Sequence, residues 1–303
     1  MTLLELIESG AARLEAARLS YGHGTSNAFD EAAWLVLWCL GLALDTPLDA
    51  PAHRPDSQAQ RPVSTDDVAR VEALLQERIR TRKPAAYLTG EAWLQGLAFY
   101  VDERCIVPRS LIAELLVQGG IDYWLSAATH RVLDLCTGNG SLAVLAALTY
   151  PEVAVYASDL SDDALAVAAI NVHRHGLQER ITLLHSDGLQ SPALQQDGPF
   201  DLILCNPPYV NADSMAHLPA EFRAEPALAL AGGVDGMDLI RGLLASAAAH
   251  LTSAGVMVLE IGHERRHFEA AFTALEVIWL ETSAGEDQVL LVTRTALEHA
   301  FAP

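Results

Sequence analysis

The stretch Val132-Leu133-Asp134-Leu135-Cys136-Thr137-Gly138-Asn139-Gly140 decides the fold that we predict for this chain. Its first four residues make a short apolar run of the kind found in buried strands, and its two glycines mark a tight turn. A helical pattern then runs from Gly140 to Leu148. Ligands of open parallel sheets bind beyond the carboxyl ends of the strands, where a glycine turn lets a ligand touch the backbone. The stretch therefore predicts a strand, a ligand-binding loop and a helix.

Apolar segments of strand length recur along the rest of the chain and alternate with helical patterns. We predict seven strands, at residues 132–135, 153–158, 181–184, 201–204, 256–260, 277–281 and 288–292. We predict helices at residues 111–125, 140–148, 162–175, 237–251 and 264–275. Continuous apolar strands that alternate with helices indicate a parallel sheet covered on both faces. The last two strands lack an intervening helix, which predicts a hairpin at the sheet edge.

The chain before this α/β region has a different organisation. Apolar residues at helical spacing predict three helices, at residues 3–14, 27–42 and 67–82. Aromatic and β-branched residues interrupted by glycines then predict a β-hairpin. We therefore divide the chain into a small helical domain (1–86), a linking β-hairpin (87–108) and an α/β domain (109–303).

The composition is that of a folded, acidic protein. Apolar residues make up 51% of the 303 residues and charged residues 19%, which is enough apolar material for a core. The net charge is −20, from 19 Lys and Arg against 39 Asp and Glu. Such a chain repels phosphate backbones and lacks the basic footprint of nucleic-acid readers, so we do not expect direct nucleic-acid binding. The charge would attract a basic protein partner, or it serves solubility alone.

Targeting signals and metal motifs are not evident. The four cysteines form no C-x-x-C pair, and the eleven histidines show no convincing metal-ligand spacing, so we predict no metal site and a reduced, cytoplasmic setting. The N-terminus, MTLLELIESG, has no basic region of the kind that begins a signal peptide. The apolar runs end well before 18 residues, so we expect no membrane span.

Acidic residues follow the second and third predicted strands. Asp159 ends the second strand, and Asp187-Gly188 follows the third. A carboxylate at the first position can accept hydrogen bonds from both hydroxyls of a ribose, because its two oxygens match a vicinal diol. Each acid alone has a plainer interpretation, with Asp134 as a turn-bonding residue and Asp159 as the cap of a helix beginning near Ser161. Three strand ends in order, each with the expected group, favour cofactor binding.

The glycine loop points to one kind of cofactor. It has the form D-x-x-x-G-x-G and lacks the third glycine of the nicotinamide fingerprint. It resembles motif I of class I methyltransferases, which cradles the methionine part of S-adenosylmethionine. The resemblance implies a class I (Rossmann-like) methyltransferase with a seven-stranded sheet and S-adenosylmethionine as cofactor. The residues assigned to the cofactor are Asp134, Cys136, Thr137, Gly138, Asn139, Gly140, Asp159, Asp187, Gly188 and Asn206.

The fourth predicted strand ends at the tetrapeptide Asn206-Pro207-Pro208-Tyr209. An amide or exocyclic amino nitrogen is a poor nucleophile, because its lone pair is delocalised into a π system. Two rigid acceptors that take hydrogen bonds from the NH₂ group localise density on nitrogen and aim the lone pair at a sulfonium methyl. The Asn206 side-chain oxygen and the Pro207 carbonyl can be those acceptors, since proline restricts both itself and the residue before it.

These groups would act as preorganised dipoles that stabilise the charge developing on nitrogen, and Tyr209 can stack on a planar substrate group. We therefore predict Asn206, Pro207 and Tyr209 as catalytic residues. The same three residues and Pro208 are predicted to bind substrate. The plainer interpretation is a Pro-Pro turn capped by asparagine.

Together, the tetrapeptide and the motif I loop resemble the protein-(glutamine-N5) methyltransferases, and the resemblance covers nearly the whole chain. One branch of that family modifies class I peptide release factors, and the other modifies large-subunit ribosomal protein three. The stretches that favour the ribosomal-protein branch are Ala92-Trp93-Leu94, Val107-Pro108-Arg109-Ser110, Leu135-Cys136-Thr137-Gly138 and Asp187-Gly188-Leu189. Cys136 departs from the usual glycine of motif I.

The resemblance implies N5-methylation of a glutamine in a basic ribosomal protein. It further implies that the N-terminal helices recognise the substrate, that the hairpin helps to close the site, and that Glu225, Pro226 and the turn Gly232–Gly236 line or cover the substrate channel. Three alternatives to this function stay open. The first is that the target is a release factor. The second is that the enzyme methylates adenine or guanine amino groups in nucleic acid, and the third is that the chain is a non-catalytic binding protein. The charge of −20 counts against nucleic acid, and the intact motifs count against a non-catalytic protein.

Overall fold

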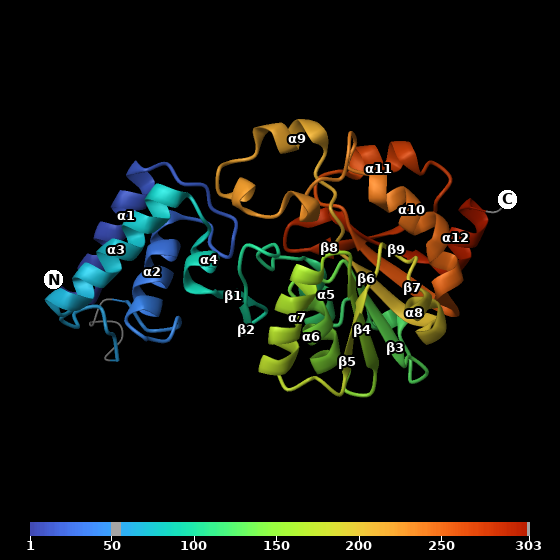
Figure 1. Ribbon diagram of the computed structural model, residues 1–303, viewed down its shortest axis with the longest axis horizontal. Coiled ribbons are helices and arrows are strands. Elements are labelled where there is room, and N and C mark those ends of the chain that lie inside the picture. The colour runs from blue at the N-terminus through green and yellow to red at the C-terminus, as the bar shows by residue number, and fades with distance from the viewer. Residues whose placement is uncertain (50–55, 302–303) are drawn as a thin grey trace. The chain divides into compact units, whose positions relative to one another are not determined.

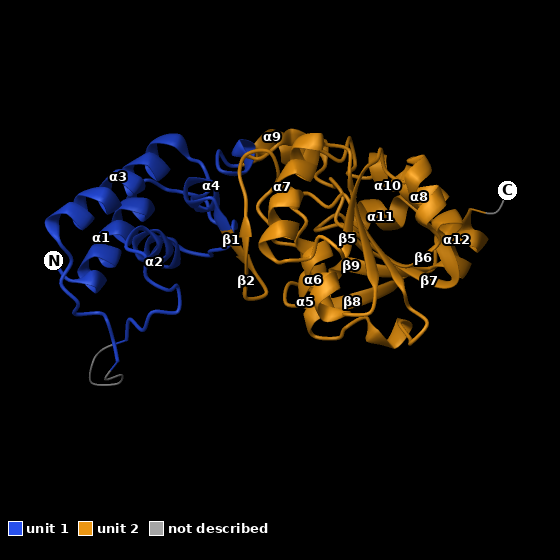
Figure 2. Cartoon of the chain, turned by 60° about the horizontal axis from the view of Figure 1, so that its bottom comes forward, with its two compact units in different colours: residues 1–91, 219–224 blue, residues 92–218, 225–303 orange. Residues whose placement is uncertain are grey.

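Residues 1–49 and 56–301 are described by the computed structural model, and they fall into two compact units. Figure 2 colours the first unit, residues 1–91 with 219–224, in blue and the second, residues 92–218 with 225–303, in orange. Six residues from late in the chain thus belong with the N-terminal helices.

The first unit is helical. Its helices are α1 (Leu3–Ala16), α2 (Ala28–Cys39), α3 (Thr65–Thr81) and the short α4 (Ala85–Thr89). Thr2 begins α1 with a capping box, in which its hydroxyl accepts from the Glu5 N–H while the Glu5 carboxylate accepts from the Thr2 N–H. Ser64 caps α3 by accepting from the Asp67 N–H. The three predicted helices are confirmed, whereas α4 was not predicted.

A buried group of charges lies inside this unit. The Arg78 side chain is fully buried, and its Nε lies 2.9 Å from the Glu31 carboxylate. Glu221, from the segment 219–224, lies 3.6 Å from Arg78 Nη1 and 2.8 Å from Arg82 Nε. Two cations and two carboxylates therefore balance one another, and of the four only Arg82 is partly exposed. Burial raises the pKa of Glu31 in spite of its ion pair with Arg78.

The second unit contains the predicted sheet. Its strands are β3 (Arg131–Leu135), β4 (Ala154–Asp159), β5 (Ile181–His185), β6 (Phe200–Cys205), β7 (Leu251–Glu260), β8 (Ile278–Thr282) and β9 (Gly285–Thr293). They pair in the order β5-β4-β3-β6-β7-β9-β8, in which the first five are parallel and β9 is antiparallel to both of its neighbours. This confirms the α/β class I methyltransferase fold, including the hairpin at the sheet edge. The separate hairpin of β1 (Glu91–Leu94) and β2 (Leu97–Tyr100) is shorter than the predicted range.

Helices cover both faces of the sheet (Figure 1). One face packs against α5 (Ile112–Val117), α6 (Ser141–Thr149) and α7 (Asp162–Arg174). The other packs against α8 (Pro192–Asp197), α10 (Asp238–Ala247), α11 (Arg265–Ala271) and α12 (Arg294–Ala300), while α9 (Ala212–His217) follows β6. Val132 points into the first core and Leu133 into the second, which explains why successive residues of β3 are apolar there.

Several predicted elements differ in length from those observed, and two of these differences are large. The predicted helix at 111–125 ends after Val117, because Gly119 adopts φ +73° and a short 3₁₀ turn, Asp122–Trp124, follows. Strand β7 begins five residues earlier than predicted, at Leu251. The fold places its switch point between β3 and β6, because the chain runs from β3 to β4 and β5 on one side and returns to β6 on the other. Ligands of such sheets bind at that point.

Candidate active site

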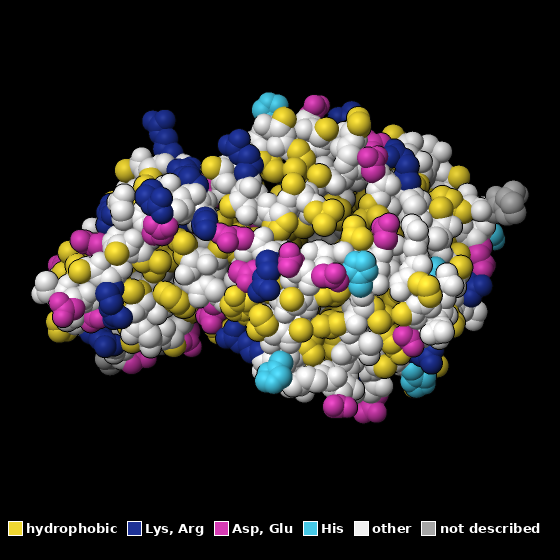
Figure 3. Space-filling view, in the orientation of Figure 1, with side chains coloured by type: hydrophobic (Ala, Val, Ile, Leu, Met, Phe, Trp, Pro, Cys, Tyr) yellow, Lys and Arg dark blue, Asp and Glu magenta, His cyan; other side chains and the backbone are white. Residues whose placement is uncertain are grey.

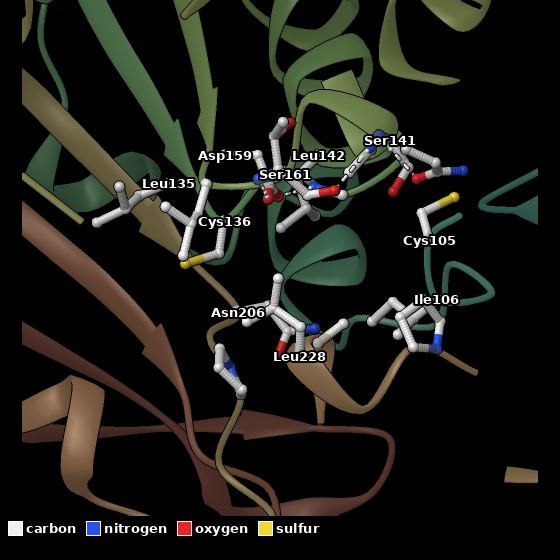
Figure 4. Close-up of a pocket in the computed structure, with 18 of the residues that line it drawn as sticks. Cys105, Ile106, Leu135, Cys136, Ser141, Leu142, Asp159, Ser161, Asn206 and Leu228 are labelled. Carbon is white, nitrogen blue, oxygen red and sulfur yellow. Dashed lines mark hydrogen bonds between the residues drawn. The ribbon is translucent and has the colours of Figure 1, made fainter. Parts of the chain in front are cut away.

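A cavity lies at the carboxyl ends of β3, β4, β5 and β6, wholly within the second unit. In Figure 4, Cys136, Asp159 and Ser141 lie on one side of it, and Asn206 and Leu228 lie on the other. Of the predicted cofactor and substrate residues, Cys136, Thr137, Gly138, Asn139, Asp159, Asp187, Gly188, Asn206 and Pro208 line this cavity. Asp134, Gly140, Pro207 and Tyr209 lie outside its lining.

The motif I loop follows β3 in a tightly turned conformation. Cys136, Gly138 and Gly140 all adopt left-handed backbone angles, with φ of +60°, +56° and +81°. Glycine takes this conformation freely, whereas a residue with a Cβ is strained by about 1–2 kcal/mol. Cys136 therefore stands in a position whose backbone favours glycine. The Thr137 N–H donates to the Ser158 carbonyl over 3.0 Å and ties the loop to β4.

Asp134 holds the loop from beneath. It is fully buried, and its Oδ2 accepts from the Thr137 hydroxyl at 2.5 Å and from the Ala143 N–H at 2.9 Å. Burial raises the pKa of Asp134 to about 7. The Asp134 side chain thus joins the loop to the first turn of α6, one layer behind the cavity.

Asp159 faces the cavity from the end of β4. Its Oδ2 accepts from the Gly138 N–H and its Oδ1 from the Ser161 N–H, each at 2.9 Å. Each carboxylate oxygen has two lone-pair directions, so both oxygens keep acceptor capacity towards the cavity. Asp187 and Gly188 follow β5 and line the same cavity.

The motif I loop also contains a buried side-chain donor without a hydrogen-bond partner among the described residues. The Asn139 side chain is only 3% exposed, and its Nδ2 has no hydrogen-bond partner among the described residues. Buried donors are nearly always paired, so this group indicates a ligand acceptor in the cavity. Ser141 and Leu142, in the first turn of α6, also line the cavity. A helix N-terminus favours a carboxylate through its partial positive charge and its free N–H groups.

The residues of the tetrapeptide that follows β6 lie in two environments, the cavity wall and the packed region outside it. Asn206 and Pro208 line the cavity, and the Asn206 side chain makes no hydrogen bond to any other described residue. The Tyr209 ring packs against Gly262, where a Cβ would come within 2.5 Å of the ring. The Tyr209 hydroxyl lies 3.4 Å from Glu260 Oε1, and burial raises the pKa of Tyr209. The predicted stacking of Tyr209 on a substrate group stays a prediction.

Glu260 ends β7 and joins three segments. Its Oε2 accepts from the Ser110 hydroxyl at 2.6 Å and from the Leu111 N–H at 2.9 Å, while its Oε1 faces Tyr209. Burial raises the pKa of Glu260, and these donors oppose that rise. The strand end therefore holds the segment before α5 beside the tetrapeptide.

The wall opposite the motif I loop was mostly missed by the sequence analysis. It comprises Arg104, Cys105, Ile106, Pro108, Arg109, Ser110, Pro226, Leu228, Ala229 and Leu239. The buried Glu225 carboxylate joins its two parts, since it accepts from the Arg109 guanidinium at 2.6 and 2.8 Å and from the Val107 N–H at 2.9 Å. Glu225 thus braces this wall, and Pro226 lines the cavity as the family resemblance implied.

Asn171 of α7 was also missed. Its Oδ1 accepts from the Tyr100 N–H at 2.7 Å, and its Nδ2 donates to the carbonyls of Tyr100 and Asn139, each at 2.9 Å. This fully buried amide joins the β1–β2 hairpin to the motif I loop. The available signal was an asparagine within the apolar stripe of a helix, since a polar residue at a buried position needs a polar partner.

The surface gives further information on partners. On the face seen in Figure 3, Lys and Arg side chains are scattered and do not form a basic stripe. Among the described residues, no helix is both long and apolar enough to cross a membrane. Across the same residues, no group of three or more His, Cys, Asp or Glu side chains could hold a metal ion.

The chain is similar to a family model and to known proteins that are named as methyltransferases. A family model described as "Methyltransferase small domain" matches residues 122–233. The "Ribosomal protein uL3 glutamine methyltransferase" of Bordetella pertussis is 52% identical over 299 residues, which cover 98% of this chain and 96% of that protein. The protein of the same name from Burkholderia pseudomallei is 49% identical, with 98% and 95% covered.

Among solved structures, the hMettl16 catalytic domain in complex with the MAT2A 3′UTR hairpin 1 aligns with a TM-score of 0.52 at 14% identity, covering 76% of this chain and 81% of that one. At this identity the likeness concerns the fold alone. The full-length relatives share about half of their residues with this chain, which carries the motif I loop and the tetrapeptide at one cavity. The chain therefore belongs to the family of ribosomal protein uL3 glutamine methyltransferases.

Proposed function

We propose that this chain transfers a methyl group from S-adenosylmethionine to the side-chain amide nitrogen of a glutamine in ribosomal protein uL3. One observation carries the proposal. The Asn206 amide stands at the end of β6 without a hydrogen-bond partner among the described residues, in the same cavity as the motif I loop and Asp159. Family membership supports the target, because the relatives are named for uL3.

The residues present fit S-adenosylmethionine group by group. Asp159 would accept from the ribose hydroxyls, and Asp187 with Gly188 would lie beside the adenine. The unpaired Asn139 Nδ2 and the N-terminal turn of α6 suit the methionine carboxylate. The bound cofactor supplies an electrophilic methyl group on a positively charged sulfur.

Asn206 and Pro207 would make the glutamine nitrogen reactive. The Asn206 side-chain oxygen and the Pro207 carbonyl accept hydrogen bonds from the substrate NH₂ group, which fixes the amide plane and draws electron density onto nitrogen. These acceptors are held in place before the reaction, so they stabilise the positive charge that develops on nitrogen without reorganising. Transfer would form the N–CH₃ bond while the bond from sulfur to the methyl carbon breaks and leaves a neutral thioether, and the nitrogen would then lose one proton to solvent. Pro208 and Tyr209 complete the substrate-binding tetrapeptide in this proposal.

The remaining assignments concern recognition. We assign binding of the protein substrate to the helical domain, residues 1–86, and closure of the site to the hairpin region, residues 87–108. Residues 109–303 carry the chemistry. The net charge of −20 suits a basic ribosomal protein, since complementary charge accelerates and orients association. The same charge disfavours a nucleic-acid target. A uL3 substrate places the reaction in the cytoplasm.

Labelling tests the target directly. An extract from cells that lack this enzyme receives the purified protein and isotopically labelled S-adenosylmethionine, and the labelled species are identified by mass spectrometry. We expect label on one glutamine of uL3. Label on a release factor would show that uL3 is not the target and that the chain acts like the branch that modifies release factors. Label confined to nucleic acid would refute the proposal.

Substitution of the proposed acceptor tests the mechanism. We expect Asn206→Ala to lower turnover by about 10² or more, because one preorganised acceptor is removed, while calorimetry shows unchanged cofactor affinity. Ser246→Ala, on the far part of α10, is the matched control and should retain activity. Full activity of Asn206→Ala would rule out the role given to Asn206.

A further inference from the structure

The turn Gly232-Gly233-Val234-Asp235-Gly236 packs behind the tetrapeptide. None of its five residues lines the cavity, although Asn206 and Pro208 do. Val210 follows the tetrapeptide and forms a parallel bridge with Ala231, in which the Val210 N–H donates to the Leu230 carbonyl at 2.8 Å. The Gly232 N–H donates to the Val210 carbonyl at 2.9 Å. The turn is therefore bonded to the residue that follows the tetrapeptide and takes no part in the lining of the cavity.

Two glycines of the turn lie closer to Tyr209 than a residue with a side chain could at the same positions. A Cβ on Gly232 would lie 2.7 Å from the Tyr209 Cα and equally close to the Gly236 carbonyl oxygen, and a Cβ on Gly236 would lie 2.3 Å from the Tyr209 carbonyl oxygen. A Cβ essentially never lies this close to a non-bonded heavy atom, and the atoms it would meet are backbone, which cannot rotate away. A side chain at Gly236 would displace Tyr209, and a side chain at Gly232 would push Tyr209 and the Gly236 end of the turn apart.

The turn itself is firmly held, so the tetrapeptide would have to move. The Asp238 N–H donates to the Gly232 carbonyl at 3.0 Å, and α10 begins at once. Asp235 accepts from the Met237 N–H at 3.1 Å and pairs with the Arg241 guanidinium. These bonds fix the turn against the start of a helix that packs on the sheet.

Displacement of Tyr209 would reach Asn206, because only Pro207 and Pro208 separate them. Each proline fixes φ near −65°, so the four residues behave as a stiff unit and not as a flexible loop. We propose that Gly232 and Gly236 are positioning residues that set the place of the Asn206 amide by allowing the turn to touch the back of Tyr209. This inference rests on the proposed role of Asn206 as the acceptor for the substrate amide.

Four glycine-to-alanine variants separate close approach from backbone strain. Gly232→Ala introduces the collision without left-handed strain, and Gly236→Ala introduces the collision together with a strained φ of +82°. Gly176→Ala, after α7, introduces strain at φ +68° with no atom within 4 Å of the new Cβ. Gly242→Ala, on the exposed side of α10, introduces neither. All four are made in the full chain.

The readouts are kcat and KM for methylation of purified uL3, cofactor affinity by calorimetry, and the melting temperature. We expect kcat of Gly232→Ala and Gly236→Ala to fall by about 10-fold to 10²-fold, since a displacement near 1 Å at a reacting group has effects of that size. We expect cofactor affinity to stay unchanged in both. Gly176→Ala should melt earlier yet keep the wild-type kcat, and Gly242→Ala should match wild type.

Two outcomes would overturn the inference. One is a kcat of Gly232→Ala equal to that of wild type, and the other is an equal loss of kcat in Gly176→Ala at matched loss of stability. If Gly232→Ala does not fold, Asp235→Asn loosens the same turn from a half-buried position and should lower kcat with unchanged cofactor affinity. An unchanged kcat in that variant would also count against the inference.

A crystal structure of Gly232→Ala beside wild type separates this inference from the proposed function. A shift of the Asn206 amide relative to Asp159 supports the positioning role even where wild type does not methylate uL3. An unmoved Asn206 would refute it even where wild type is fully active.

Discussion

Replacement of Asn171 by leucine removes the three hydrogen bonds that join α7 to the β1–β2 hairpin and to the motif I loop. Leucine has the same branched skeleton but is larger, so the change deletes polar partners without opening a cavity. The Tyr100 N–H, the Tyr100 carbonyl and the Asn139 carbonyl each lose this partner. An unpaired buried group costs about 1–3 kcal/mol, and water can reach the half-buried Tyr100, so we expect a loss of about 3–5 kcal/mol.

Urea denaturation followed by circular dichroism measures this loss, and a melt should shift down by roughly 10 °C, at ~2–4 °C per kcal/mol for a chain of this size. The Asn139 carbonyl belongs to the loop that lines the cavity, so we also expect weaker binding of S-adenosylmethionine by calorimetry. Ile170→Leu, at the neighbouring exposed position, controls for helix propensity and should change neither quantity. A stability loss below about 1 kcal/mol would show that these bonds are replaced by others, and would refute the reasoning.

Three further predictions concern stability. In the folded chain Asp134 keeps its proton up to about pH 7, whereas the unfolded chain releases it near pH ~4, so wild type should lose stability relative to Asp134→Asn as pH rises from 4 to 7. Urea titrations at several pH values measure that difference, and equal pH slopes in the two proteins would contradict it. Glu225→Ala leaves Arg109 without its carboxylate and should lower the free energy of unfolding by about 3 kcal/mol, at the low end for a broken buried pair because Arg109 is 27% exposed. Its measurement is a urea titration beside Glu225→Gln, which keeps an acceptor and should lose less. Ser64→Ala removes the cap that bonds the Asp67 N–H and should cost about 1 kcal/mol by thermal melting, so an unchanged melt would argue against that cap.

The sheet could be predicted from sequence because its strands are buried on both faces. Runs such as Val132–Leu135 are apolar apart from Asp134, and a parallel sheet covered by helices on both faces favours that pattern. The early start of β7 could not be predicted, because residues 251–255 include Thr252, Ser253 and Gly255 and have the composition of a turn. Pairing of Phe200 with Leu251 holds that part of the strand in the sheet. Tertiary contact thus overrides local propensity there.

The candidate site was predicted only in part, for a related reason. Parallel strands bring their carboxyl ends to one edge, so Asp159, Asp187 and Asn206 could be placed together from strand order alone. The rest of the lining comes from residues 104–106, 108–110, 226, 228, 229 and 239, whose place depends on contacts such as that between Arg109 and Glu225. These residues are more than 110 positions apart, and no local pattern connects them.

The segment 219–224 also bears on the order in which the chain can complete its structure during synthesis. The helices of the first unit emerge early, yet Glu221, the carboxylate that faces both Arg78 and Arg82, emerges only after the intervening 127 residues of 92–218. At about 5–20 residues per second, this interval lasts roughly 6–25 s. Throughout that time Arg78 has Glu31 alone as its carboxylate partner, so the N-terminal helices reach their final electrostatic balance only when most of the catalytic sheet has been made.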